Sequence, residues 1–257
     1  MIGWLESFDM DLDLQGRAYI VTGGTRGLGN AAARALTTEG AKVVVSGLKV
    51  ADEDEVVAGL GGSGQAAVLS ADNGDPRTPG RLIEAARGAF GRLDGVLISV
   101  GGPPPGTALD TPEDAWRTAF DQTFLGAVRL AQAVAAELGA GGVIGFVLST
   151  SVYEPIPGLA VSNALRPALA GFAKTLANEL GPRGIRVVGF LPAHIATDRQ
   201  RELAGIHGGP ETLASVPLRR YGQPEEFGRV AAFVLSPAAS YITGAMVSVD
   251  GGVMTGF

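Results

Sequence analysis

Short apolar runs alternate with longer helical stretches along the whole chain, and this alternation is what most constrains the fold. The runs predicted as strands are residues 17–22, 42–46, 65–70, 95–99, 143–148, 185–190 and 245–249. Their residues are nearly all apolar, as expected for strands covered on both faces. Strands separated by helices pair in parallel through right-handed crossovers. The sequence therefore predicts a doubly wound α/β fold: one parallel seven-stranded sheet with helices on both faces.

Composition argues against several other classes of protein. The 257 residues carry a net charge of −6, whereas a nucleic-acid-binding surface needs a basic face. No apolar run is long enough for a membrane span. With two histidines and no cysteine, neither a multi-histidine metal site nor a disulfide is expected. We expect a cytoplasmic protein with a small-molecule substrate, and no metal, nucleic acid or membrane as partner.

The chain reads as one domain, residues 12–257, preceded by an N-terminal extension, residues 1–11. The extension is acidic and lacks the basic start of a signal peptide. Within the domain, two connections stand out. Residues 101–106 contain three consecutive prolines and must be stiff. The connection at about 197–217 is long for a compact fold, and long connections are often lids, so we predict a substrate lid there.

The segment TGGTRGLG, residues 22–29, follows the first predicted strand and opens the first helix. In such a turn Gly23 allows the tight bend, Gly27 lets the backbone approach a pyrophosphate, and Gly29 lets the helix pack closely on the strand. The helix N-terminus offers free N–H groups and a positive partial charge to phosphates. A plain glycine-rich turn is the alternative, but the position between strand and helix favours dinucleotide binding.

The Thr-Gly-x-x-x-Gly-x-Gly spacing resembles that of the short-chain dehydrogenase/reductase family. Further similarities follow in order: Asp72-Asn73, then residues 181–197, then residues 222–252. The resemblance covers about residues 12–252 and is nearest to 3-oxoacyl-acyl-carrier-protein reductases. It implies a Rossmann-type fold and hydride transfer between NAD(P)H and a carbonyl or alcohol. The cofactor-binding residues it implies are Gly23, Thr25, Arg26, Gly27, Leu28, Gly29, Ser46, Asp72, Asn73, Ser99, Val100, Gly101, Arg166, Pro192, Ile195 and Thr197.

The choice of nicotinamide cofactor depends on the residues after the second predicted strand. An acidic residue there would bind the ribose diol of NAD and repel a 2′-phosphate. The sequence instead reads Ser46-Gly47-Leu48-Lys49. Arg26 and Lys49 could meet a 2′-phosphate, the alternative being that both are solvated surface cations. We therefore expect NADP(H) to be favoured, with NAD(H) as the alternative.

The resemblance also implies a set of reacting residues, and here the sequence departs from the family. The serine is kept as Ser149, but the tyrosine, lysine and asparagine positions read Ser162, Arg166 and Thr123. A serine hydroxyl is far less acidic than the general-acid tyrosine. Arg166 keeps the positive charge of the lysine but cannot relay a proton. Pro167 follows, so the helix is expected either to start at Arg166–Pro167 or to kink there.

Two other side chains are candidates for the proton donor. Tyr153 lies in the loop after the fifth predicted strand, and His194 lies beside the expected nicotinamide site. Histidine titrates near neutral pH, although each of the two could simply be a packed loop residue. A Ser149–His194 nucleophile–base pair is a further alternative that lacks an evident acidic partner.

Two functions therefore stay open. One is an oxidoreductase with an atypical active site. The other is a homologue that binds the nucleotide without turnover, as a sensor, scaffold or partner subunit. The helices at 112–138 and 162–180 are rich in Ala, Gly and Leu. By resemblance they form an interface between subunits, which implies a homotetramer or a homodimer.

Overall fold

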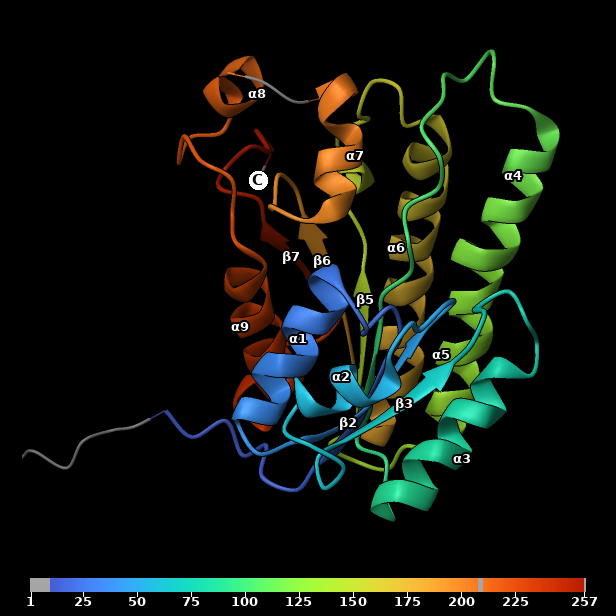
Figure 1. Ribbon diagram of the computed structural model, residues 1–257, viewed down its shortest axis with the longest axis vertical. Helices are drawn as coiled ribbons and strands as arrows, with labels where there is room; N and C mark the ends of the chain where they lie inside the picture. Colours follow the sequence, from blue (N-terminus) through green and yellow to red (C-terminus); the bar gives the residue numbers. More distant parts are fainter. Residues whose placement is uncertain (1–9, 208–209, 257) are drawn as a thin grey trace, which may run out of the picture.

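The computed structural model describes residues 10–207 and 210–256, and in them the seven predicted strands form one sheet (Figure 1). All neighbouring strands are parallel, in the order β3-β2-β1-β4-β5-β6-β7. Their bounds are β1 Ala18–Val21, β2 Lys42–Gly47, β3 Ala66–Ser70, β4 Gly95–Ile98, β5 Val143–Val147, β6 Arg186–Pro192 and β7 Met246–Val249. The predicted doubly wound fold is confirmed. Its strand order reverses between β1 and β4.

Two layers of helices cover the sheet (Figure 1). One face packs against α1 (Gly27–Thr38), α2 (Glu53–Ala58) and α9 (Pro224–Leu235), and the other against α3 (Thr78–Phe90), α5 (Gly126–Glu137) and α6 (Ala160–Leu180). Successive strand residues point to opposite faces. Val44 thus joins one buried apolar cluster, whereas Val43 and Val45 join the other. None of the helices in the described residues is long and apolar enough to cross a membrane.

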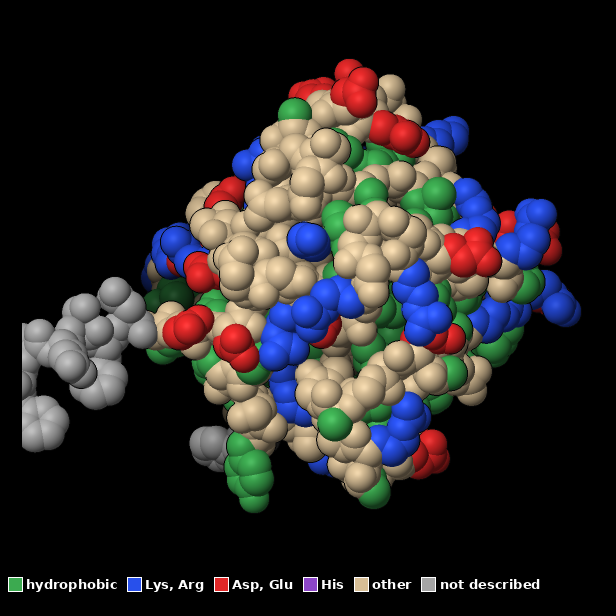
Figure 2. All heavy atoms as spheres, turned by 90° about the horizontal axis from the view of Figure 1, so that it is seen from below, with side chains coloured by type: hydrophobic (Ala, Val, Ile, Leu, Met, Phe, Trp, Pro, Cys, Tyr) green, Lys and Arg blue, Asp and Glu red, His purple; other side chains and the backbone are tan. Residues whose placement is uncertain are grey.

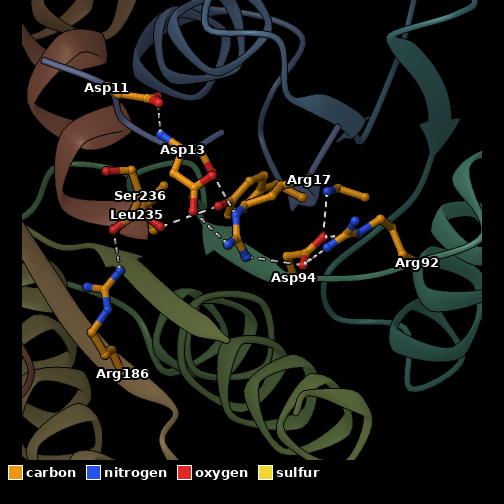
Figure 3. A network of polar contacts seen from close by, with 10 residues as sticks. Asp11, Asp13, Arg17, Arg92, Asp94, Arg186, Leu235 and Ser236 are labelled. Carbon is orange, nitrogen blue, oxygen red and sulfur yellow. Dashed lines mark hydrogen bonds and ion pairs between the residues drawn. The ribbon is translucent and has the colours of Figure 1, made fainter. Parts of the chain in front are cut away.

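Ionic and backbone contacts hold the N-terminal ends of the strands together (Figure 3). One carboxylate oxygen of Asp94 accepts the Ala18 amide at 2.8 Å, and the carboxylate also pairs with Arg92 at 2.7 Å and Arg17 at 3.5 Å. Nearby, the buried Arg186 donates to backbone carbonyls at the end of α9. Seen from this side, the surface carries Lys and Arg interspersed with Asp and Glu (Figure 2).

The remaining helical segments include two departures from expectation. The helix expected over 112–138 is divided by a π-helical segment, η1 (Phe120–Leu125), between α4 (Glu113–Ala119) and α5. The predicted lid region contains α7 (Asp198–His207) and α8 (Pro210–Ser215). The short 3₁₀ segments are η2 (Thr150–Val152), η3 (Gly181–Arg183) and η4 (Pro237–Ala239).

Of the two alternatives predicted for α6, a start at Arg166–Pro167 or a kink there, the start is wrong. The helix begins at Ala160 and contains Pro167. Its first turn is fixed by tertiary contacts, because the Ala160 amide donates to the Gly106 carbonyl at 3.1 Å and the Asn163 side chain bonds both backbone groups of Ile156. The helix therefore tolerates the loss of the one backbone hydrogen bond that Pro167 cannot make.

Candidate functional site

A cleft of about 1220 Å³ opens at the carboxyl ends of the strands, where the strand order reverses. Open α/β sheets bind ligands at this position. In Figure 1, α7 and α8 lie at this end of the sheet. The predicted site residues that line the cleft are Gly23, Thr25, Arg26, Gly27, Leu28, Gly29, Ser46, Asp72, Asn73, Ser99, Val100, Gly101, Thr123, Ser149, Ser162, Arg166, Pro192, His194, Ile195 and Thr197.

Tyr153 is the one predicted site residue that the structure places outside the lining of the cleft. It follows the 3₁₀ turn η2, its side chain is 62% exposed, and it does not line the cleft. The turn carries Tyr153 outward because the Ser149 hydroxyl accepts the Ser151 amide and the Tyr153 amide donates to the Thr150 carbonyl. Tyr153 therefore has no position from which to protonate a substrate in the cleft.

The glycine turn has the shape required to receive a pyrophosphate. Gly23 adopts φ +58°, and a Cβ there would lie 2.5 Å from the Ser99 carbonyl oxygen. Gly27 also adopts φ +58°, yet a Cβ on it would meet nothing within 4 Å, so its backbone borders open space. A Cβ on Gly29 would overlap the Gly23 carbonyl. The first and third glycines are thus required for packing, and the second leaves room for a ligand.

The N-terminus of α1 is suited to an anion. The residue before it, Arg26, is extended (φ −156°) and makes no side-chain cap. The first turn of this 12-residue helix contains no acidic side chain. Its leading N–H groups therefore face the cleft without a carboxylate of the chain to satisfy them.

The end of the cleft where the sequence predicts the adenosine lies between the glycine turn and the end of β2. A Cβ on Gly47 would lie 2.6 Å from the Thr25 hydroxyl oxygen, which shows how closely the two segments approach. Arg26 and Lys49 both line the cleft here, and both are exposed. Neither forms an ion pair with any of the described acidic side chains. Two cations are thus available at one corner.

Three serine hydroxyls lie close together at the end of β5. The Ser149 hydroxyl accepts the Ser151 amide at 3.1 Å, and the Ser151 hydroxyl lies 3.5 Å from that of Ser162. Ser149 and Ser162 line the cleft, whereas Ser151 is buried behind them. Thr123 reaches the same region from the π-helix η1. Interruptions of this kind in an α-helix frequently occur at functional sites.

Arg166 is the most unusual charged group of the cleft. It is 5% exposed and donates to the Val147 carbonyl at 2.9 Å and to the Val100 carbonyl at 3.4 Å. No described carboxylate pairs with it. Burial, with a smaller contribution from the positive charge of Arg199, lowers the pKa of Arg166 to about 10. The guanidinium is still protonated at neutral pH.

His194 lines the cleft from the segment that follows β6. Its ring packs edge-on against Tyr221 with centroids 6.3 Å apart, and its backbone carbonyl accepts the Gly222 amide. The imidazole is thereby fixed beside the cleft. Metal coordination has no evident place here, because the described residues contain no group of three or more potential ligands.

The sequence reasoning missed one cleft residue of consequence, Arg199. It lies in the first turn of α7 and donates to the Pro103 carbonyl at 2.6 Å, with an ion pair to Glu202 at 3.4 Å. This contact ties the predicted lid region to the proline-rich loop. No pattern in the sequence singles out Arg199 among the neighbouring charged residues of its helix, since the contact forms between segments far apart in the chain.

Comparison with known proteins shows the family of this chain. The family model described as enoyl-(acyl carrier protein) reductase matches residues 23–254. The chain is 35% identical to bovine dehydrogenase/reductase SDR family member 4, over 93% of this chain and 88% of the relative. The chain belongs to the short-chain dehydrogenase/reductase family. The resemblance inferred from the glycine turn is thereby confirmed.

Other members of this family widen the comparison. L-rhamnose 1-dehydrogenase (NAD(P)(+)) of Azotobacter vinelandii is 33% identical, over 92% of this chain and 96% of its own. The crystal structure of a short chain dehydrogenase from Burkholderia cenocepacia in complex with NADP superposes with a TM-score of 0.86 at 31% identity. That superposition covers 94% of this chain and 99% of the other. The predicted class, an oxidoreductase of the short-chain dehydrogenase/reductase type, is confirmed at the level of the family.

Proposed function

We propose that this chain is an NADP(H)-preferring oxidoreductase that interconverts a carbonyl and an alcohol on a small molecule, with an atypical set of reacting residues. The observation that carries this proposal is the composition of one cleft. It joins a glycine turn open at Gly27, the hydroxyl of Ser149 and the buried cation of Arg166. NAD(H) remains the alternative cofactor, since relatives use either one.

The cofactor would lie along the cleft from the glycine turn to the end of β5. The free N–H groups of α1 would hold the pyrophosphate, and Arg26 and Lys49 would bind the 2′-phosphate of NADP(H). Ser46, Asp72 and Asn73 would border the adenosine, and Pro192, Ile195 and Thr197 would border the nicotinamide. NADPH, when bound, supplies a hydride to the carbonyl carbon.

The reacting end differs from the family pattern at three positions. Ser162, Arg166 and Thr123 stand where the family has tyrosine, lysine and asparagine. In our proposal the Ser149 hydroxyl donates a hydrogen bond to the substrate carbonyl oxygen. Arg166, fixed by the Val147 and Val100 carbonyls, supplies positive potential as negative charge develops on that oxygen. The guanidinium does not have to reorient when this negative charge develops, because its two carbonyl bonds already hold it in place.

A proton must also reach the substrate oxygen. Ser162 is too weak an acid for this step, and Arg166 stays protonated at neutral pH. His194 has the most suitable unperturbed pKa of the side chains in the cleft. We assign the proton to His194, directly or through water. The Ser149–His194 hydrolytic pair is not favoured, because the cleft is that of a dinucleotide-binding fold.

Two measurements, made one after the other, test the proposal. Calorimetric titration with NADPH and NADH is expected to show binding, with NADPH tighter. A panel of aldehydes and ketones is then expected to include one that oxidises NADPH in an enzyme-dependent manner. NADPH binding without turnover on any carbonyl would support instead the homologue that binds the nucleotide as a sensor, scaffold or partner subunit. Absence of binding to both cofactors would refute the proposal.

A further inference from the structure

Two arginines at the substrate end of the cleft are held by one short loop. Arg166, from α6, bonds the carbonyl of Val100, and Arg199, from α7, bonds the carbonyl of Pro103. A Cβ on Gly102, between these carbonyls, would lie 2.9 Å from the Arg199 side chain. Helices α6 and α7 therefore bring two guanidinium groups to the same side of the cleft.

Among the described residues, neither Arg166 nor Arg186, the other deeply buried arginine, pairs with a carboxylate, but Arg166 has fewer carbonyl bonds to compensate its buried charge. Arg186 donates to three carbonyls, those of Val234, Ser236 and Ile242, around the C-terminal end of α9. The negative end of that helix dipole compensates its charge. Arg166 has two carbonyl bonds, one of them 3.4 Å long, and three of its five N–H donors make no bond within the described chain.

The acidic side chains that line the cleft are engaged or exposed. Glu202 pairs with Arg199 at 3.4 Å but is mostly exposed, and Asp198 pairs with Arg201. Glu154 accepts two hydrogen bonds from Thr255. In addition, Asp72 accepts the Gly74 amide, and Asp114 is exposed in the first turn of α4. None of these carboxylates pairs with Arg166 among the described residues.

We infer that the substrate of this cleft carries an anionic group, a carboxylate or a phosphate, which binds between Arg166 and Arg199. Guanidinium groups match the geometry of both anions. The mutual repulsion of the two cations, and the cost of burying Arg166, would be relieved when the anion enters. Because Arg199 belongs to α7, the same anion would fix the lid region over the reacting carbonyl. This inference rests on the proposed function and names its substrate class.

Paired probes test the inference by binding, without the need for turnover. The pairs are 4-oxopentanoate with its methyl ester, and dihydroxyacetone phosphate with dihydroxyacetone. Calorimetry would be done on the protein alone and on the protein loaded with NADP⁺. In at least one pair the anion is expected to bind about tenfold or more tightly than its neutral partner, as charge-assisted hydrogen bonds do. The pair that responds identifies carboxylate or phosphate. Equal binding within both pairs would overturn the inference.

Arg199→Gln provides the matched variant, since Arg166→Met is expected to impair folding. We expect Arg199→Gln to weaken binding of the anion roughly tenfold. The affinities for the neutral partner and for NADP⁺ should change by less than about twofold. Arg201→Gln is the control, because Arg201 lies on the same helix, is 77% exposed and pairs with Asp198. Equal losses in the two variants would contradict the inference. If NADPH binds and neutral ketones are reduced, but the anionic probes bind no more tightly than their neutral partners, this inference fails and the proposed function stands.

Discussion

At the scale of single residues, the proposed preference for NADP(H) rests on the corner of the cleft formed by Arg26 and Lys49. Both side chains are exposed, line the cleft and lack an ion-pair partner among the described residues. They are therefore free to meet a 2′-phosphate, which only NADP(H) carries. An arginine–phosphate contact is charge-assisted and geometrically specific.

Arg26→Ala is expected to weaken NADPH binding by roughly tenfold and NADH binding by less than about twofold. Calorimetric titration of both cofactors measures the ratio. Arg34→Ala is the control, because Arg34 is exposed on the same helix, α1, and does not line the cleft. An unchanged NADPH-to-NADH ratio in Arg26→Ala would remove Arg26 from the proposed cofactor site.

In our proposal His194 supplies the proton and the Ser149 hydroxyl holds the substrate carbonyl. His194→Gln is expected to lower kcat with little change in NADPH affinity, and to alter the acidic limb of the pH–rate profile, because glutamine does not titrate. Ser149→Ala is expected to reduce turnover more than Ser162→Ala, since Ser149 holds the carbonyl. Steady-state kinetics across pH measure both effects. An intact pH profile in His194→Gln, together with loss of turnover in Ser162→Ala, would show that this assignment is wrong.

At the scale of elements, the sequence was most informative about the strands and least informative about long-range contacts. Each predicted strand is found within about two residues, because buried parallel strands read as apolar runs. The π-helical turn at η1 and the early start of α6 leave no such signature. They depend on contacts with distant segments, such as the bond from the Ala160 amide to the Gly106 carbonyl.

The candidate site follows the same division. The glycine turn and the strand ends were predictable because a doubly wound sheet collects them at one edge. Tyr153 was misplaced, because the 3₁₀ turn that directs it outward depends on a local hydrogen bond of Ser149. Arg199 was missed, because its contact with Pro103 joins segments 96 residues apart.

The C-terminal end of α9 depends on a side chain from another element. Arg186, on β6, is 7% exposed and bonds the carbonyls of Val234, Ser236 and Ile242. Arg186→Met leaves these buried acceptors without a donor, so we expect the free energy of unfolding to fall by about 2–4 kcal/mol. Urea denaturation measures this change. The control Arg77→Met removes a pair whose arginine is 84% exposed, and it should leave the free energy of unfolding nearly unchanged. Equal effects would contradict the role given to Arg186.

At the scale of the whole molecule, assembly is the open property. The helical layer that contains α5 and α6 is rich in Ala, Gly and Leu, a composition suited to close packing of helices between subunits. We predict a homotetramer with two-fold axes, with a homodimer as the alternative. Light scattering at micromolar concentration is expected to give about four times the 26.2 kDa mass of the chain. A monomer mass would contradict the prediction.

The central claim is our proposal that this cleft transfers hydride with Ser162 and Arg166 at the positions where the family resemblance implies a tyrosine and a lysine. The most direct test is transfer of deuterium to a carbonyl substrate from NADPH that carries deuterium at both hydrogens of the nicotinamide C4, read by mass spectrometry of the alcohol product. The proposed function predicts one deuterium in the product of the wild-type protein, with less product from Ser149→Ala. Tight NADPH binding with no deuterated product from any carbonyl of the panel, anionic or neutral, would contradict it.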